Sequence, residues 1–466
     1  MSKDLRQFLQ VAKEAGADFY VEVKKPLKPR FEKDILQLKL DREGRFPVIY
    51  CREIEGSKLP LVSNLFGSYE LLGLALDMNP KVSTKADVFR EYRRRKQNAV
   101  PVQVVPASKA PVKEVVLRDK DVDLGLLPIN HHAELNSDRY VTIGNMVCRD
   151  PDSGIPNVGV YRHELKGKNK LGAWFSPANH SSYHVRRCAE LGEPMEVAMF
   201  VGHHPAVVLG SLSAGDINEN EFEVMGGFLE EQLRVTSAET VDLPVPADAE
   251  IVIEGTIDPR NMVTDAPFAE WTGYYGVNRP CYLIEVKCMN MRHDAIYHDL
   301  APSQREHCVA GVLGFTSVIY DAVRSVVPTV KDVCFPFSGR HEMIVYVSIA
   351  QRVPGEAKRA ALAALNTLSP TNIAVVVDDD IDIYNEEEVI WAIATRATPD
   401  LDIITVPRVL GGPLNPMSYD ETRLNGGPMN SKMLIDATKP VELPLPTRVT
   451  PSKDLWNSMK IEDYLK

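Results

Sequence analysis

The chain has 466 residues, 44% of them hydrophobic and 25% charged, a composition typical of a globular protein with a sizeable core. Its net charge of -11 argues against a role in binding nucleic acid, because a phosphate backbone is bound by a concentrated basic surface. Seven scattered cysteines favour neither a disulfide framework nor a thiolate zinc site, and no apolar run of about 18 residues predicts a membrane span. We therefore expect a cytoplasmic protein with no membrane or nucleic-acid partner. At this length two or three domains are expected, since one core rarely exceeds about 300 residues.

The segment 1–110 is predicted to be a small α/β unit. Asp4 is a suitable helix N-cap, and it precedes an amphipathic stretch that ends at Gly16. Prolines at positions 101, 106 and 111 favour an extended connector and a domain boundary near residue 110. The predicted elements are helices over 4–13, 68–78 and 85–96 and strands over 19–23 and 46–51.

The segment 111–300 is predicted to be rich in β-strands and to form a barrel. Short alternating runs are broken by Gly, Pro and Asp, and few helical stretches separate them. Strands are predicted over 140–148, 197–201, 206–209, 250–254 and 281–288.

After residue 300 the pattern changes to alternating helices and strands. An apolar helix over 306–323 is predicted to link two domains, with the linking segment at 301–325. Segment 326–440 is predicted to be an α/β domain with some parallel pairing, from strands over 343–349, 373–377 and 402–406 and helices over 356–368 and 386–397. The tail, 441–466, is amphipathic over 455–465, and we expect it to dock on a neighbouring subunit or on its own chain. The predicted fold is thus α+β and multidomain.

One candidate site lies at Asn157–Arg162, which reads Asn-Val-Gly-Val-Tyr-Arg. On a strand, Asn157 and Arg162 point to opposite faces, so a single site that uses both must wrap the strand or lie at its bent end. With His180 and Glu221, the amide oxygen of Asn157 forms a donor set that suits Mn²⁺ or Mg²⁺ better than Zn²⁺. The alternatives are an ordinary strand with an exposed arginine, structural histidines, or another trio that includes 131–132 or 203–204.

A second candidate site is the stretch from Asp265 to Glu270, followed by Trp271. Two carboxylates that flank a proline and aromatic residues can support general acid–base chemistry when an arginine keeps one of them ionised. The alternative is a surface turn in which Asp265 caps and Trp271 packs. The sequence contains no phosphate-binding glycine loop, no Gly-x-Ser-x-Gly elbow and no His-Glu-x-x-His motif. This argues against a Rossmann protein, a P-loop protein, a hydrolase with a nucleophile elbow and a zinc protease.

Taken in order, these motifs resemble the UbiD family of decarboxylases. The resemblance is carried by Asn157-x-Gly-x-Tyr-Arg162, His180, Glu221, Glu239 through Glu254-Gly, Pro-Phe-x-Glu270-x-x-Gly-Tyr, the Val375 to Tyr384 run and Ser431-Lys432 to Asp436. It covers nearly the whole chain.

The resemblance implies a prenylated FMN cofactor whose phosphate is held through Mn²⁺, often with K⁺, in a flavin-reductase-like split β-barrel. It also implies a C-terminal α/β domain that closes over the cofactor and mediates homo-oligomers, either dimers or hexamers, and a flavin prenyltransferase that supplies the cofactor. The metal ligands carry over to Asn157, His180 and Glu221, and the catalytic network carries over to Arg162, Asp265 and Glu270. Implied cofactor contacts are Asn157, Val160, Tyr161, Arg162, Asn179, His180, Ser211 and Lys432. Many relatives have glutamate at the position of Asp265, so that end of the network is expected to shift or to use a water.

The implied reaction is the reversible loss of CO₂ from an aromatic or heteroaromatic acid, with Arg162 orienting the carboxylate and Glu270 delivering the proton. Trp271 is expected to wall the substrate pocket, and His298 and Arg305 to line it. A second acidic group on Arg305 favours furan-2,5-dicarboxylate, with pyrrole-2-carboxylate or a hydroxybenzoate of the protocatechuate or vanillate type next. Arg305 has an alternative role as a salt-bridge partner of Glu306 or Asp299. Two other readings stay open, namely a non-catalytic flavin-binding partner subunit and an ordinary flavin oxidoreductase.

Overall fold

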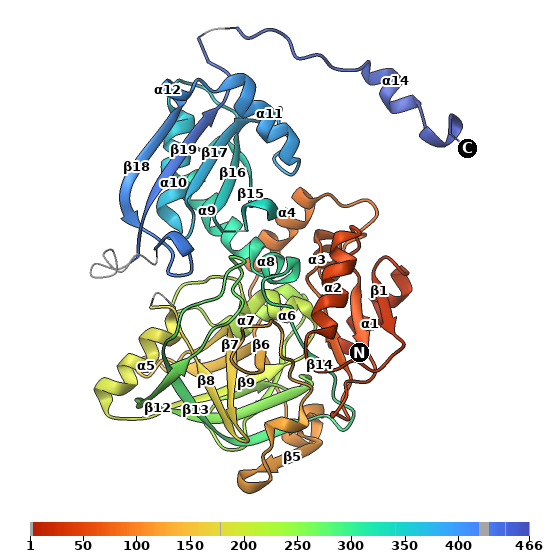
Figure 1. The fold of residues 1–466 in the computed structure, drawn as a ribbon, viewed down its shortest axis with the longest axis vertical. Coiled ribbons are helices and arrows are strands. Elements are labelled where there is room, and N and C mark those ends of the chain that lie inside the picture. The colour runs from red at the N-terminus through yellow and green to blue at the C-terminus, as the bar shows by residue number, and fades with distance from the viewer. Residues whose placement is uncertain (1–2, 178, 341, 419–427, 443, 466) are drawn as a thin grey trace.

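The computed structural model describes residues 3–177, 179–340, 342–418, 428–442 and 444–465. Figure 1 shows a β-barrel at the bottom, the N-terminal unit in red beside it, and the C-terminal α/β domain in blue above them. A tail with the short helix α14 (Lys453–Ser458) projects away from this body.

The N-terminal unit confirms the predicted helices and strands. Helix α1 (Leu5–Ala15) begins at Asp4, whose side chain accepts a hydrogen bond from the backbone N–H of Gln7, and it buries the predicted apolar face. Strands β1 (Tyr20–Val23), β2 (Val48–Cys51) and β3 (Leu61–Ser63) form a sheet whose fourth strand, β14 (Tyr297–His298), arrives from far along the chain. The other helices are α2 (Glu32–Arg42), which was not predicted, α3 (Tyr69–Ala75) and α4 (Lys85–Lys96).

The β-rich region closes into an antiparallel barrel, as predicted. Its strands run in the order β12-β9-β6-β7-β8-β13, and an additional β12–β13 pairing closes the ring, while β5 (Val115–Arg118) extends the edge at β13. The barrel strands are β6 (Tyr140–Arg149), β7 (Pro156–Gly167), β8 (Lys170–Ala173), β9 (Met195–Val201), β12 (Ile251–Asp265) and β13 (Arg279–Met291).

The predicted strand over 206–209 is wrong, because this segment lies in helix α6 (Pro205–Ser211). Pro205 occupies the first turn, and the imidazole of His204 accepts a hydrogen bond from the N–H of Ala206 as an N-cap. A short apolar run fits a strand or a buried helix equally well, so the periodicity did not distinguish them.

Two further helices begin at predicted metal ligands, α5 (His180–Leu191) and α7 (Glu221–Leu229). A small sheet of β11 (Pro244–Pro246), β10 (Arg234–Ser237) and β4 (Gln103–Val104) lies outside the barrel. Short 3-10 turns occur at Ala107–Lys109, Pro111–Lys113, Asp119–Asp121, Leu124–Leu126, Phe337–Gly339, Pro416–Ser418 and Ile461–Asp463.

The linking segment consists of α8 (Arg305–Ala310) and α9 (Val312–Val326), which meet at Gly311. Taken together, Arg305–Val326 is long and apolar enough to span a membrane, but 56% of the apolar window is buried inside the protein, which fits a core helix.

The C-terminal domain has a sheet in the order β15-β16-β17-β19-β18, in which β16, β17 and β19 are parallel. Its elements are β15 (Val330–Cys334), β16 (Ile344–Ile349), α10 (Glu356–Thr367), β17 (Ile373–Asp378), α11 (Glu386–Arg396), α12 (Pro399–Asp402), β18 (Ile403–Leu410) and β19 (Met429–Ala437). The predicted alternation with some parallel pairing is confirmed.

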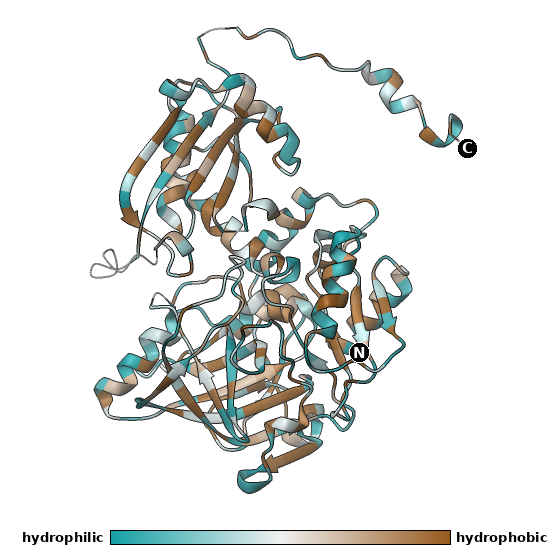
Figure 2. Ribbon diagram, viewed as in Figure 1, coloured by the Kyte–Doolittle hydropathy of each residue, from teal (hydrophilic) through white to brown (hydrophobic). Residues whose placement is uncertain are grey.

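Hydrophobic residues are frequent along the strands of the barrel and of the C-terminal sheet (Figure 2). One buried cluster joins residues of α1, α3, α6, α7, α9 and the C-terminal sheet, and a second fills the barrel. The linking helices therefore share a core with both neighbouring regions, and this fixes the C-terminal domain above the barrel.

Candidate active site

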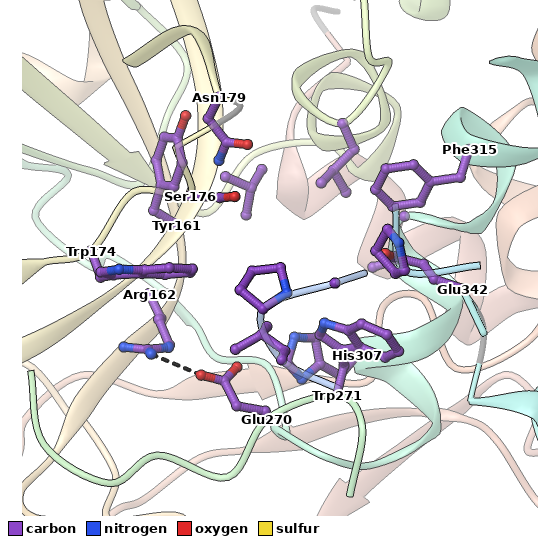
Figure 3. A pocket seen from close by; sticks show the side chains of 18 of the residues that line it. Tyr161, Arg162, Trp174, Ser176, Asn179, Glu270, Trp271, His307, Phe315 and Glu342 are labelled. Atoms are coloured by element: carbon purple, nitrogen blue, oxygen red, sulfur yellow. Dashed lines mark hydrogen bonds and ion pairs between the residues drawn. The ribbon is translucent and has the colours of Figure 1, made fainter. Parts of the chain in front are cut away.

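A cavity of about 480 Å³ lies between the barrel, the linking helices and the C-terminal domain. This volume is in the range of small-molecule and cofactor sites. Figure 3 shows Arg162, Trp174 and Glu270 on one side and Phe315 and Glu342 on the other. The lining includes Thr142, Val160, Tyr161, Arg162, Trp174, Asn179, Phe268, Glu270, Trp271, Leu300, His307, Phe315, Glu342, 367–370 and 412–414.

Arg162 brings the two predicted carboxylates together at the cavity wall. Its Nη1 donates to Asp265 Oδ1 at 2.7 Å, and its Nη2 donates to Asp265 Oδ2 at 2.9 Å and to Glu270 Oε1 at 2.8 Å. Burial alone lowers the pKa of Arg162, but the attraction of Glu270 and Asp265 outweighs burial and raises it. The guanidinium is thus a fixed cation that borders the cavity.

Asp265 contacts Arg162 directly, so the network does not require a bridging water at the shorter carboxylate. The guanidinium carbon of Arg162 also lies 4.7 Å from the ring centroid of Phe268, which restricts its orientation.

Asn157, His180 and Glu221 converge at the other end of the same strand. Asn157 Nδ2 donates to Glu221 Oε1 at 2.7 Å and lies 3.3 Å from His180 Nδ1. Burial raises the pKa of Glu221 to about 8, which is the signature of a carboxylate that lacks a countercharge. With the Asn157 amide turned so that Oδ1 faces Glu221 and His180, these three groups fit a hard divalent cation, which would neutralise Glu221 and leave coordination positions for water or phosphate.

Val160, Tyr161 and Asn179 line the cavity between these two clusters. The hydroxyl of Tyr161 donates to Ser181 Oγ at 3.0 Å. In contrast, Ser211 Oγ donates to the Val207 carbonyl within α6. Lys432 is buried and donates to the Leu368 carbonyl at 3.0 Å, so it holds the loop at the cavity rim instead of facing the cavity.

Of the three residues predicted to bind substrate, only Trp271 lines the cavity. His298 lies on β14 with its ring fully buried against Phe66, and burial lowers its pKa to about 3. Arg305 donates to the Gly67 carbonyl and stacks on the rings of Phe46 and Phe337. This geometry gives no support to a substrate contact at either residue.

Charged and aromatic residues near the cavity that were not predicted from sequence include Trp174, Arg279, His307 and Glu342. Trp174 stands six residues before His180, and a tryptophan so close to a candidate ligand was a usable signal. Burial and the charge of Arg162 lower the pKa of His307 to about 4, and burial raises the pKa of Glu342 to about 7. Only the tertiary structure brings the last two to the same cavity as Arg162.

Comparison with known proteins agrees with this architecture. Residues 103–305 match the 3-octaprenyl-4-hydroxybenzoate carboxy-lyase Rift-related domain, and residues 311–437 match the C-terminal domain of the same enzyme class. The chain belongs to the UbiD family of prenylated-FMN-dependent decarboxylases. Its enzyme class is carboxy-lyase, as the resemblance implied.

Individual UbiD-family relatives are moderately similar over most of their length. The UbiD-class enzyme HmfF from Pelotomaculum thermopropionicum, solved with FMN, is 33% identical with a TM-score of 0.91, covering 99% of this chain and 100% of that one. An evolved dimeric form of HmfF was solved with prFMN; it is 32% identical with a TM-score of 0.87, and the match covers both chains fully. Anhydromevalonate phosphate decarboxylase from Methanothermobacter thermautotrophicus is 31% identical over 86% of this chain and 90% of its own. Phenolic acid decarboxylase from Sedimentibacter hydroxybenzoicus is 29% identical over 94% and 92%.

Proposed function

We propose that this protein binds prenylated FMN and removes CO₂ reversibly from an aromatic or heteroaromatic carboxylic acid. The observation that carries the proposal is the contact of Arg162 with both Asp265 and Glu270 at the wall of a cavity of about 480 Å³. The same cavity is lined by Val160 and Tyr161, from the strand that carries Asn157, and by Asn179, the residue before His180.

Mn²⁺ is proposed at Asn157, His180 and Glu221, where it would link a cofactor phosphate to the protein, and K⁺ is proposed to accompany it. The uncompensated Glu221 carboxylate supports a cation there. Bound prenylated FMN would supply the electron sink that an aryl carbon needs when its carboxylate leaves.

The residues of this chain have separate tasks in the proposed reaction. Arg162 orients the substrate carboxylate through charge-assisted hydrogen bonds. Phe268, Trp174 and Trp271 exclude water and enclose the flat ring of the substrate between aromatic side chains. Glu270 takes up a proton from solvent when the substrate anion binds, and after the bond to CO₂ breaks it delivers that proton to the ring carbon.

We propose an aromatic acid with a single carboxylate as the substrate, ahead of furan-2,5-dicarboxylate. Arg305 is turned away from the cavity, and the far wall carries the Glu342 carboxyl, so the second carboxylate of furan-2,5-dicarboxylate would lack its proposed partner. Acids with one carboxylate and a neutral polar group, such as a hydroxybenzoate or pyrrole-2-carboxylate, fit this wall better. The similarity to a phenolic acid decarboxylase supports the same order.

The test is CO₂ release by protein co-expressed with a flavin prenyltransferase and purified without oxygen in Mn²⁺ and K⁺. The panel is furan-2,5-dicarboxylate, pyrrole-2-carboxylate, protocatechuate, vanillate and anhydromevalonate phosphate. We expect turnover of at least one monocarboxylic ring and none of the phosphate ester, because Arg162 is the only arginine or lysine among the described residues that line the cavity. Cofactor binding without turnover of any acid would favour the non-catalytic partner subunit, and NAD(P)H oxidation would favour the oxidoreductase.

We further propose a homo-oligomer in the cytoplasm. The tail exposes large apolar side chains, with Trp456 73% and Ile461 70% accessible, and a partner copy would cover such groups. All seven cysteines are free and buried, which suits a reducing compartment. Size-exclusion chromatography with light scattering would distinguish a dimer from a hexamer.

A further inference from the structure

A second guanidinium stands behind the Arg162 network. Strands β12 and β13 form a hairpin whose ladder ends at the cavity with Asp265 paired to Arg279. The loop between these two residues carries Glu270 and Trp271 into the cavity. The hairpin therefore fixes Arg279 beside both carboxylates of the network.

Arg279 lies just beyond hydrogen-bond distance of those carboxylates. Its Nε is 3.6 Å from Asp265 Oδ2, and its Nη2 is 3.8 Å from Glu270 Oε1. Both nitrogens are buried and have no hydrogen-bond partner among the described residues. A buried N–H without a hydrogen-bond partner is costly, so an acceptor that moves within reach of Nε or Nη2 would stabilise the Arg279 guanidinium.

The surroundings hold Arg279 at this distance. Its guanidinium carbon lies 4.2 Å from the ring centroid of Trp174, which is itself part of the cavity wall. A Cβ at Gly276 would lie 2.9 Å from Arg279 Nη2 and 3.1 Å from Glu270 Oε1, so the glycine leaves open the space between the two groups. A small movement of Glu270 is enough to close the gap.

Arg162 cannot serve every carboxylate of the working site equally. Its Nη2 already donates to both Asp265 and Glu270. A substrate carboxylate that approaches this nitrogen competes with Glu270 for the same N–H group.

We propose that Arg279 is a positioning residue that receives Glu270 when a substrate carboxylate takes its place on Arg162. Glu270, which takes up a proton from solvent as the substrate anion binds, then accepts a hydrogen bond from Arg279 through its carbonyl oxygen and keeps its hydroxyl beside the carbon that it must protonate. This inference rests on the proposed decarboxylase function and assigns to that site a residue outside the cavity lining.

The test compares kcat and KM of cofactor-loaded wild type with those of Arg279→Gln. We expect kcat to fall about 10- to 100-fold, because the proton donor is misplaced, while KM changes less than about twofold, because Arg162 still binds the carboxylate. Arg279→Lys retains a charged donor and is expected to recover most of the loss. Arg260→Gln is the matched control, since Arg260 is exposed on the same hairpin and pairs only with Asp258 among the described residues.

Gly276→Ala provides a second route, because its methyl group would separate Arg279 from Glu270; it should lower kcat with little change in KM. Thermal unfolding checks that each variant is folded, and Gly276→Ala decides the matter if Arg279→Gln is not. Unchanged kcat in Arg279→Gln, or a rise in KM that matches the fall in kcat, would overturn the role of Arg279 alone. A wild type that binds cofactor and turns over no acid would instead overturn the proposed function, and this inference with it.

Discussion

Two of the buried charge clusters among the described residues are similar in composition, and one of the two borders the cavity. The cavity cluster is Arg162, Asp265, Glu270 and Arg279. The sealed cluster is Lys33, Asp34, His132 and Asp299, in which Lys33 Nζ lies 2.9 Å from a carboxylate oxygen of each aspartate. The two histidine nitrogens lie 3.2 Å from Asp34 and 3.4 Å from Asp299.

The clusters differ in what surrounds them. In the sealed cluster every side chain is at most 5% exposed, and it joins α2 of the N-terminal unit to the barrel. Its side chains do not line the cavity, but Asp299 Oδ1 accepts a hydrogen bond at 3.0 Å from the hydroxyl of Thr142, which does. Paired buried charges are therefore not by themselves a sign of chemistry; access to a cavity separates the cluster with a proposed catalytic role from the structural one.

The largest expected effect is a loss of stability in Lys33→Met, a change within the sealed cluster. Removal of the cation leaves two buried aspartates with too little countercharge, which is expected to lower the free energy of unfolding by about 3–5 kcal/mol. Turnover per folded molecule should change little. Chemical denaturation and active-site-normalised kinetics measure the two quantities, with exposed Lys25→Met as the control. A stable but inactive Lys33→Met would contradict the division between the clusters.

A smaller effect is expected at the proposed metal ligands, in Glu221→Gln. Loss of the anionic ligand should weaken Mn²⁺ binding by at least about 100-fold, or about 2.7 kcal/mol, with little loss of fold. Mn²⁺ titration followed by electron paramagnetic resonance measures the affinity. Glu223→Gln, in the same first turn of α7, is the control. Equal Mn²⁺ affinities in the two variants would show that Glu221 does not bind the metal.

The smallest effect is on pH dependence, at Glu342. Burial raises the pKa of this carboxyl from 4.5 to about 7, so the neutral form stabilises the folded protein. That contribution is complete below about pH 4.5 and is lost as pH rises through about 7. Glu342→Gln should therefore be more stable than wild type at pH 8.5 by on the order of 1 kcal/mol, after allowance for partial exposure, and equal to it near pH 4.5.

Unfolding midpoints of wild type, Glu342→Gln and the exposed control Glu387→Gln across this pH range test the prediction. If the difference in unfolding midpoint between wild type and Glu342→Gln did not change with pH over this range, burial would not raise the pKa of Glu342 in the folded protein.

Local rules recovered much of the fold from the sequence. Helix α1 was predicted with its cap and buried face because both depend on residues within a few positions of one another. The barrel and the C-terminal alternation followed from strand spacing. Strand β14 was not predicted as part of the N-terminal sheet, because its pairing with β3 joins segments more than 200 residues apart in a register that only the tertiary structure sets.

The site shows the same division. Family motifs indicated Arg162, Asp265, Glu270 and the metal trio, and the structure brings each set together. Side-chain direction was not readable from sequence, so His298 and Arg305 were assigned to a pocket that neither lines. Arg279 could have been found by pairing the predicted strand at 281–288 with the residues that precede the acidic loop, which sets it opposite Asp265.

Hydrogen–deuterium exchange at the ring carbon is the sharpest test of Glu270 as the proton donor, because it isolates the proton transfer from the loss of CO₂. Cofactor-loaded protein would be incubated in deuterated water with the decarboxylated product of its best substrate, and mass spectrometry would follow ring deuteration. We expect deuterium at the former carboxyl carbon in wild type and a rate of ring deuteration at least about 100-fold lower in Glu270→Gln. Exchange that is undiminished in Glu270→Gln would contradict this role of Glu270.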